Sequence, residues 1–288
     1  MRHRYALTIA YDGGHFLGFQ TQIDGSTVQS TLEQALSTAL RERITIQAAG
    51  RTDSGVHATG QLVSFRTTVI IDEVHSFLRS IDALAGPHIQ VVAFHKVPYD
   101  FHPRFDCIAR QYEYLLSFNR HSLFMSPYLW TVNDPVDHDL FAAELITLKG
   151  EHNFEAFTKK ANPEENKKRY IDQIDIKQRT DPLSNQTITS VTIRGNAFLH
   201  NMIRIIIGTA IDRAAGRLQL SLVETLNRKD RTLAGKTAPA NGLFFRAAYY
   251  PEIEDLQGIG LQLLSDYPIF GNSLYKQKLQ QLQPHSPA

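Results

Sequence analysis

The segment AGRTDSGVHATGQ, residues 49–61, determines how the N-terminal half of the chain is interpreted. Apolar and β-branched residues precede it at 44–48 and follow it at 61–67, which predicts a glycine-bearing loop between two strands. An Asp-Ser-Gly sequence is ordinary turn chemistry, so a plain turn is one interpretation. The other is a catalytic loop, because Asp53 lies two residues after Arg51 and a nearby cation favours a charged, nucleophilic carboxylate.

Helix and strand patterns alternate outward from this loop. Residues 28–40 repeat apolar side chains at the spacing of one helical face, and STVQ at 26–29 is a capping-box pattern before them. Strands are predicted at 4–10 and 89–97, and a second helix at 72–84. The resulting order, β-α-β-β-α-β, is a split β-α-β arrangement.

The second half of the chain has a similar outline. Its clearest element is a strongly apolar helix at 199–215, which Gly216 is expected to end. We therefore predict an α+β fold, in which two related split β-α-β halves share a largely antiparallel central sheet flanked by helices. The other elements predicted here are strands at 109–118, 171–177, 188–194 and 243–249, and helices at 138–148 and 221–227.

A proline-bearing turn near 98–103 marks the expected boundary between the halves. The predicted domains are an N-terminal half at 1–102, which carries the Asp53 loop, and a C-terminal half at 103–250. The remaining tail, 251–288, is expected to form a helix or to stay mobile.

Composition limits the class of protein. The chain has 288 residues, of which 42% are hydrophobic and 20% are charged, so it can bury a core. Its single cysteine, Cys107, excludes an internal disulfide framework. Its longest apolar run is far shorter than the roughly 20 residues that span a bilayer, so we expect a soluble, cytoplasmic protein with no membrane partner. The net charge is only +1, and a site for a polyanion must therefore come from a local cluster.

Several common catalytic motifs are missing from the sequence. It contains no Gly-x-x-x-x-Gly-Lys-Ser/Thr phosphate loop, and Gly13, Gly14 and Gly18 do not fit a dinucleotide-binding fingerprint. Its twelve histidines are scattered without a His-Glu-x-x-His motif, so no metal site is expected. Thr52 replaces the first glycine of a nucleophile elbow, which leaves a serine hydrolase weakly supported.

Taken with motifs elsewhere, residues 49–61 resemble the catalytic motif of the tRNA pseudouridine synthase A family. The resemblance covers about residues 4–250, with Phe19 where tryptophan is frequent in the family. Segment 80–89 departs from the family pattern. The other matching motifs are YDG at 11–13, GFQ at 18–20 with Gln22, FHPRF at 101–105, ARQYEY at 109–114, GEHNF at 150–154, NAFLHNMIR at 196–204, IGT at 207–209, RTLA at 231–234 and APANGL at 238–243.

This resemblance implies the pseudouridine synthase fold and a specific reaction. Family members convert uridine to pseudouridine in the tRNA anticodon stem-loop, at positions 38 to 40. They break the bond from C1′ to N1 and join C5 to C1′, without cofactor or metal. They act as homodimers on tRNA.

The resemblance also implies roles for individual residues. Asp53 matches the catalytic aspartate, for which attack on C1′, attack on C6 and removal of the C2′ proton are all open. Arg51 matches the arginine that pairs with that aspartate. Tyr112 matches the tyrosine that stacks on the uracil and is a candidate base at C5, and Leu243 matches the apolar residue on the other face of the base.

Basic residues provide the candidate RNA contacts. Arg204 lies on the apolar helix, where a charge should be paired or aimed into a cleft, and we expect the cleft. The other candidates are either phosphate contacts or parts of a solvated loop: Lys159, Lys160, Lys167, Lys168 and Arg169.

Two other functions stay open at this point. One is a catalytically silent protein that binds or folds tRNA on the same scaffold. The other is a related synthase that acts on a different RNA.

Overall fold

The computed structural model describes residues 2–23, 25–118, 124–159, 164–181 and 185–250. The chain divides into two compact units. The first unit contains Met1–Arg110 and, from the end of the described chain, residues 244–250; the second unit is Gln111–Leu243. This division by contacts groups residues 103–110 and the last strand with the N-terminal part, and the domain boundary after residue 102 stays a prediction. The expected tail, 251–288, lies outside the described residues.

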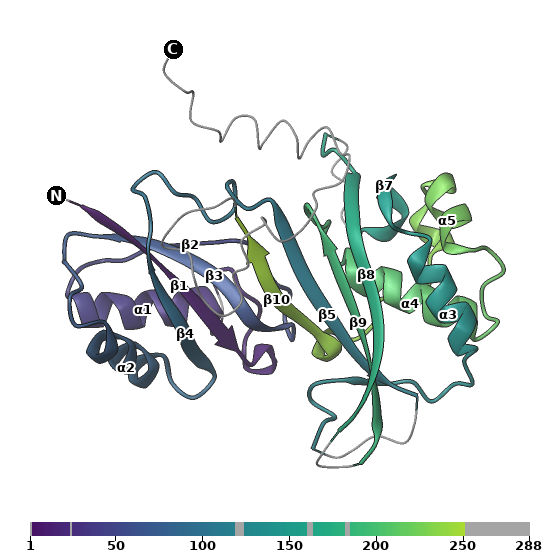
Figure 1. The fold of residues 1–288 in the computed structure, drawn as a ribbon, viewed down its shortest axis with the longest axis horizontal. Helices are drawn as coiled ribbons and strands as arrows, with labels where there is room; N and C mark the ends of the chain where they lie inside the picture. The colour runs from purple at the N-terminus through teal and green to yellow at the C-terminus, as the bar shows by residue number, and fades with distance from the viewer. Residues whose placement is uncertain (1, 24, 119–123, 160–163, 182–184, 251–288) are drawn as a thin grey trace. The chain divides into compact units, whose positions relative to one another are not determined.

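The first unit contains a sheet with the strand order β4-β1-β3-β10 (Figure 1). β1 runs antiparallel to β3 and β4, β2 pairs antiparallel with β3, and β10 pairs parallel with β3. The predicted order β-α-β-β-α-β is confirmed. The strands are β1 (His3–Tyr11), β2 (Ile46–Ala48), β3 (His57–Thr67), β4 (Ile89–Lys96) and β10 (Leu243–Tyr249), and the helices between them are α1 (Val28–Leu40) and α2 (Val74–Ala85).

Aromatic side chains connect the helix α2 to this sheet. The ring of Phe77 on α2 lies 6.4 Å from that of Phe65 on β3 and 6.2 Å from that of Phe94 on β4. Tyr5 on β1 adds ring contacts to Phe65 and Phe94 at 6.0 and 5.1 Å. These residues form one aromatic cluster between α2 and the sheet, in which Tyr5 and Phe65 are buried and Phe77 and Phe94 are partly buried.

Two local details of the first unit add to what the sequence indicates. The capping box of α1 is formed by Thr27 and Ser30, so it begins one residue later than STVQ at 26–29 suggests. Segment 80–89 carries a structural carboxylate, since the side chain of Asp82 accepts a hydrogen bond from the Val91 amide at 2.7 Å. That bond lies next to the register shift between β1 and β4.

The second unit contains a sheet with the order β5-β9-β8-β7, and β6 pairs parallel with β5. β8 is antiparallel to both β7 and β9. With these strands the α+β class is confirmed for both units, and each sheet is mixed. The strands are β5 (Ala109–Ser117), β6 (Trp130–Thr131), β7 (Gly150–Asn153), β8 (Lys168–Thr180) and β9 (Thr187–Gly195).

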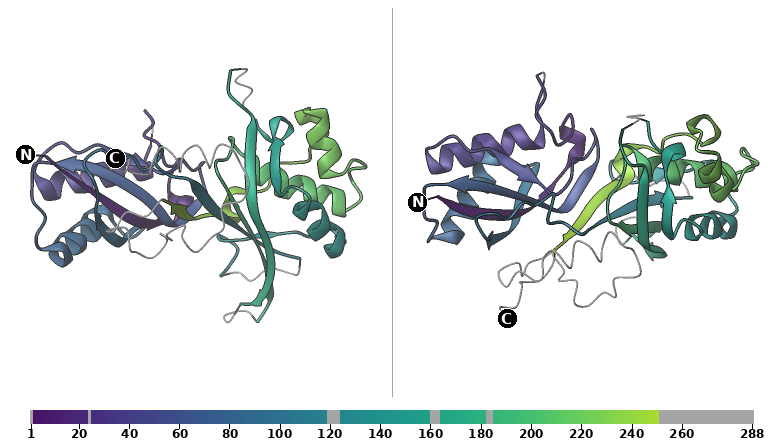
Figure 2. Two further views of the ribbon diagram at one scale, coloured as in Figure 1. Left: turned by 45° about the horizontal axis from the view of Figure 1, so that its top comes forward. Right: turned by 90° about the horizontal axis from the view of Figure 1, so that it is seen from above.

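Three α-helices of the second unit pack together, and α4 is buried on nearly all sides (Figures 1 and 2). α4 begins three residues later than predicted, because Asn201 before it adopts a left-handed conformation with φ of 60°. The helices are α3 (His138–Ile146), α4 (Met202–Ala214) and α5 (Leu222–Arg228), and the short 3-10 helices of the chain are η1 (Gly13–His15), η2 (Glu155–Phe157), η3 (Arg231–Leu233) and η4 (Ala240–Gly242).

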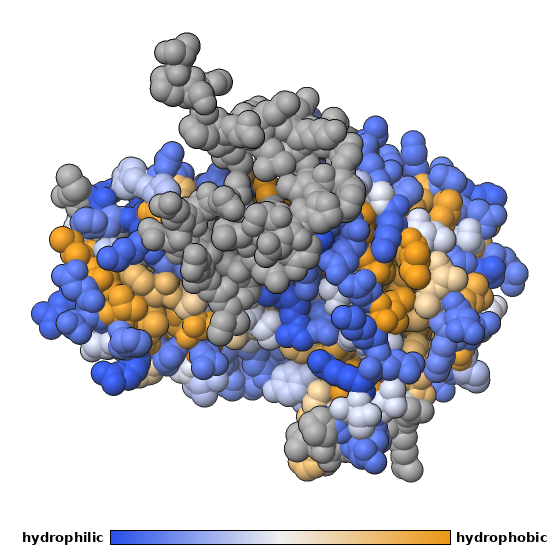
Figure 3. All heavy atoms as spheres, in the orientation of Figure 1, coloured by the Kyte–Doolittle hydropathy of each residue, from blue (hydrophilic) through white to orange (hydrophobic). Residues whose placement is uncertain are grey.

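Polar residues dominate the face of the molecule drawn in Figure 3, and apolar residues appear there in smaller groups. Within the described parts of the chain, no helix combines the length and the apolar character needed to cross a membrane.

Candidate active site

The loop that carries Asp53 is held through its backbone. The carbonyl of Thr52 accepts a hydrogen bond from the Phe19 amide at 3.0 Å. The carbonyl of Asp53 itself accepts from the Val56 amide at 3.1 Å, which closes the turn. The hydroxyl of Ser54 donates to the carbonyl of Phe16 at 3.2 Å. Because these bonds bracket Asp53 on both sides, its Cα position is set independently of its carboxylate.

A buried pair of hydroxyls adds a further anchor. The Tyr11 hydroxyl at the end of β1 lies 2.8 Å from that of Thr52, and both residues are buried. Burial raises the pKa of Tyr11 to about 12, since the charged phenolate would lose its hydration. Tyr11 therefore keeps its hydroxyl proton at physiological pH, and either hydroxyl of the pair can donate the hydrogen bond.

Two glycines allow the N-terminal segment to approach the loop closely. A Cβ on Gly13 would lie 2.0 Å from the carbonyl oxygen of Val56, which no real side chain tolerates. Gly18 has φ of +101°, a conformation that favours glycine, and a Cβ there would lie 3.1 Å from the carbonyl oxygen of Thr52. The YDG and GFQ motifs thus supply the surface on which the Asp53 loop rests.

The base of the loop is closed by three further hydrogen bonds. The Ala49 amide donates to Leu62 at 2.9 Å, and the Gln61 side chain donates to the Gly50 carbonyl at 2.8 Å. The guanidinium of Arg110 donates to the Ala49 carbonyl at 2.9 Å. The loop therefore leaves β2 and enters β3 along fixed paths.

Asp53 is partly exposed and Arg51 is exposed. The role of Arg51 as the partner of Asp53 stays a prediction.

Tyr112 and Leu243 belong to the second unit, and Tyr114 connects their surroundings. Tyr112 is 8% exposed and makes an edge-on ring contact with Phe198 at 5.3 Å. Two residues further along β5, the Tyr114 hydroxyl donates to the Pro239 carbonyl at 2.8 Å. A Cβ on Gly242 would lie 2.8 Å from the Tyr114 ring, so the residue before Leu243 packs directly on this strand.

Arg204 is anchored to the same segment, 238–242. Its Nε donates to the Ala238 carbonyl at 2.8 Å, and its backbone carbonyl accepts from the Ala238 amide at 3.0 Å. Its Nη1 also donates to the Asn201 side chain at 2.8 Å. The second unit thus brings Tyr112, Arg204 and Leu243 into one neighbourhood, through Tyr114 and segment 238–242.

Comparison with known proteins settles the family. A family model described as tRNA pseudouridine synthase matches residues 7–106 and 145–251. The chain belongs to the tRNA pseudouridine synthase family.

Relatives in this family match over most of their length. A protein of Leptospira biflexa named tRNA pseudouridine synthase A is 39% identical over 264 residues, which are 89% of this chain and 98% of the relative. A Protochlamydia amoebophila protein named tRNA pseudouridine synthase A 2 is 34% identical, covering 85% of this chain and 93% of its own. A Hydrogenovibrio crunogenus protein named tRNA pseudouridine synthase A is 35% identical, covering 90% and 97%. The resemblance inferred from the motifs is confirmed.

The family match covers most of the candidate residues. Arg51, Asp53, Arg204 and Leu243 fall inside the matched segments, whereas Tyr112 falls in the stretch between them. The assignment of Tyr112 therefore depends on its motif, ARQYEY at 109–114, and on its place beside Tyr114 on β5.

The basic residues are not equally available to a ligand. Lys167 and Arg169 lie 3.2 and 3.1 Å from the two carboxylate oxygens of Glu165, and burial lowers the pKa of the Arg169 guanidinium. Lys159 and Lys168 are exposed. Lys160 lies outside the described residues. The exposed lysines are thus the better candidates for phosphate contacts.

One supporting residue was missed at the level of sequence. His57 is buried at the start of β3, where its Nδ1 lies 3.1 Å from both the Gly13 amide and a carboxylate oxygen of Asp12. Its ring also stacks on that of Phe244 on β10, at 4.8 Å. His57 stands inside the 49–61 motif, but its polar partners come from the YDG motif 44 residues earlier.

Proposed function

We propose that this protein isomerises uridine to pseudouridine in the anticodon stem-loop of tRNA, at one or more of positions 38 to 40. Membership of the tRNA pseudouridine synthase family supports an isomerase that acts on tRNA. The observation that carries the proposal is the Asp53 loop, whose backbone is bound on both sides of the aspartate while its side chain is partly exposed.

The proposed reaction conserves all atoms. The bond from C1′ to N1 breaks, the uracil turns, and C5 bonds to C1′. The proton on C5 then leaves and N1 gains a proton. Since product and substrate have the same composition, the reaction needs neither an oxidant nor a group donor. We accordingly propose that no cofactor takes part.

Asp53 is the proposed nucleophile or base. Attack on C1′, attack on C6 and removal of the C2′ proton all require a charged carboxylate held against the nucleoside. A backbone fixed at Thr52, Asp53 and Val56 suits each of them, because a small displacement of a reacting group is costly. The exposed side chain of Arg51 is suited to occupy the space that the uridine leaves in the RNA.

Residues of the second unit are proposed to hold the base. Tyr112 would stack on the uracil and take the C5 proton, and Leu243 would cover the opposite face. Arg204, fixed by Ala238 and Asn201, would direct a guanidinium at the RNA. We also propose that the protein acts in the cytoplasm and that two copies of the chain bind one tRNA together.

The test is Asp53→Asn, with Asp72→Asn as the matched control. Both changes remove one charge from the first unit, but Asp72 is exposed and lies outside the loop. Turnover of Asp53→Asn should fall below detection, because each of the three mechanisms needs the carboxylate. tRNA binding should persist, since a negative charge has been removed near phosphates. Tritium release from C5-labelled uridine in tRNA and a binding curve on the same preparation measure both effects.

Retained tritium release in Asp53→Asn would remove Asp53 from the chemistry. A wild-type protein that binds tRNA but releases no tritium would support the silent tRNA-binding alternative. Loss of binding and release together, with a lowered melting temperature, would show that Asp53 serves mainly as a turn residue.

A further inference from the structure

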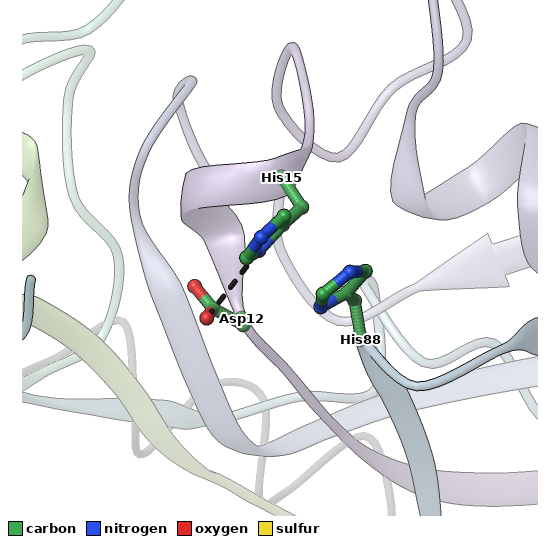
Figure 4. A group of neighbouring side chains, drawn as sticks. All are labelled: Asp12, His15 and His88. Carbon is green, nitrogen blue, oxygen red and sulfur yellow. Dashed lines mark ion pairs between the residues drawn. The ribbon is translucent and has the colours of Figure 1, made fainter.

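Three potential metal ligands meet beside the turn that supports the Asp53 loop. Asp12 follows β1 at Tyr11, His15 lies in η1, and His88 precedes β4, all within the first unit (Figure 4). One ligand atom from each residue lies within 4.8 Å of the other two. Asp12 and His88 are half-buried, and His15 is 52% exposed.

The backbone holds these residues together. The Asp12 amide donates to the His88 carbonyl at 3.0 Å, and the His15 amide donates to the Asp12 carbonyl at 3.3 Å. Oδ1 of Asp12 accepts from the Gly14 amide at 3.0 Å, and Oδ2 faces Nδ1 of His15 at 3.4 Å. The rings of His15 and His88 stack at 3.5 Å with an angle of 11° between them. The cluster is thus part of the pairing of β1 with β4.

The donor set selects a class of ion. Two imidazole nitrogens and one carboxylate suit zinc and the neighbouring divalent transition metals, whereas magnesium and calcium prefer oxygen ligands alone. Ligands of one tetrahedral zinc ion stand about 3.3 Å apart, given bond lengths of about 2.0 Å. The cluster must therefore contract, and rotation of the exposed His15 ring out of the stack provides that movement.

We propose that Asp12, His15 and His88 form a binding site for a zinc-class divalent ion, with solvent in the remaining coordination position. This site goes beyond the proposed function, since the isomerisation itself does not use it. It does adjoin the supports of the Asp53 loop. Oδ1 of Asp12 lies 3.1 Å from Nδ1 of buried His57, and the neighbouring Gly13 packs against Val56. A bound ion would stabilise this turn by mass action.

The experiment measures binding of zinc alone to the full chain after removal of metal. Competition with a chromophoric chelator gives the dissociation constant, and cobalt substitution gives a visible spectrum that reports four-coordinate ligation. The variants are His15→Gln, which alters an exposed side chain, and His88→Gln, which retains the carbonyl that Asp12 uses. His75→Gln is the matched control, because His75 is exposed on α2, away from the cluster.

We expect one zinc equivalent in wild type and in His75→Gln, with at least tenfold weaker binding in both His15→Gln and His88→Gln. Zinc should raise the melting temperature of the first two proteins more than that of the other two. Equal affinity in all four proteins would overturn the site, as would binding weakened in only one of the two cluster variants. Neither result depends on tRNA, so failure of the metal site leaves the proposed isomerase untouched.

Discussion

The Asp53 loop of the first unit and the Tyr112 neighbourhood of the second unit are stabilised in different ways. The loop is held mainly by hydrogen bonds to its own backbone, most of them from residues between Tyr11 and Leu62 and one from Arg110. Tyr112 is held by packing against side chains such as Phe198 that lie far away along the chain. A carboxylate can therefore be replaced in the loop without moving its backbone, whereas changes near Tyr112 alter the packing that places it.

Among single substitutions, Tyr112→Phe should cause the largest loss of turnover after Asp53→Asn, and it tests the second of these two regions. The phenyl ring preserves the edge contact with Phe198 and the stacking surface for uracil, but the hydroxyl is lost. We expect tRNA affinity close to wild type and turnover reduced about 10²–10⁴-fold, the usual contribution of a general acid or base. Single-turnover tritium release with saturating enzyme measures the chemical step separately from binding.

Tyr99→Phe offers a control for loss of a tyrosine hydroxyl, since Tyr99 is exposed on the first unit and lies outside both regions. Near-normal turnover in Tyr112→Phe would limit Tyr112 to stacking and would require another base at C5.

The next largest loss of turnover should come from Gly13→Ala, which disturbs the turn that packs against the Asp53 loop. Gly13→Ala would place a Cβ 2.0 Å from the Val56 carbonyl oxygen, so the turn and the loop must separate. Overpacking of this kind costs about 1–3 kcal/mol of stability. A shift of about 1 Å in Asp53 should lower turnover about 100-fold. Thermal melts and single-turnover kinetics measure the two effects.

Gly14→Ala is the control for this prediction, because a Cβ there meets only the flexible Asp12 side chain, at 3.2 Å. Equal turnover in Gly13→Ala and Gly14→Ala would show that the contact with Val56 does not position Asp53.

The same contrast explains which features were predictable from sequence. Local patterns predicted α1 and the last strand, 243–249, because their periodicity is complete within the segment. β3 begins at His57 rather than Gln61, since pairing with Phe244 and Tyr11 extends the strand into the glycine-rich motif. Phe244 lies 187 positions after His57, and no local sequence pattern indicates a pairing over that distance.

The candidate site follows this rule as well. The motif containing Asp53 was identified from its own residues, whereas the supporting contacts of Gly13 and Gly18 became apparent only when the chain was folded. The cluster of Asp12, His15 and His88 was missed, because histidines separated by 73 residues show no metal-binding spacing. The short strand β7 was missed because GEHN has no apolar alternation.

A smaller effect on stability should follow from Tyr11→Phe. Loss of the hydrogen bond to Thr52 should cost about 1 kcal/mol at pH 7. The folded pKa of Tyr11, about 12, lies above the usual value of 10.0, so the stability linked to this proton is complete below pH 10 and is lost as pH rises towards 12. The difference in unfolding free energy between wild type and variant should therefore narrow above pH 10.

Urea denaturation at pH 8 and pH 11 tests this directly. Other tyrosines titrate in both proteins and cancel in the difference. A difference that stays constant between these pH values would mean that Tyr11 is not protected from solvent as the buried pair with Thr52 requires.

The smallest expected effect concerns the basic segment near β8, where neighbouring cations differ in availability. Lys167 and Arg169 are engaged with Glu165, but Lys168 is exposed, so Lys168 is the residue expected to touch an RNA phosphate.

Loss of one phosphate contact lowers the slope of log K against log salt by about 0.7–0.9. Lys168→Gln should show this change with little loss of turnover at saturating tRNA, while Lys96→Gln, which removes an exposed lysine on β4, should keep the wild-type slope. Binding curves at four or more salt concentrations provide both slopes. If the two variants have the same slope as wild type, Lys168 belongs to a solvated loop, and Lys159 and Arg204 become the candidates for RNA contacts in the second unit.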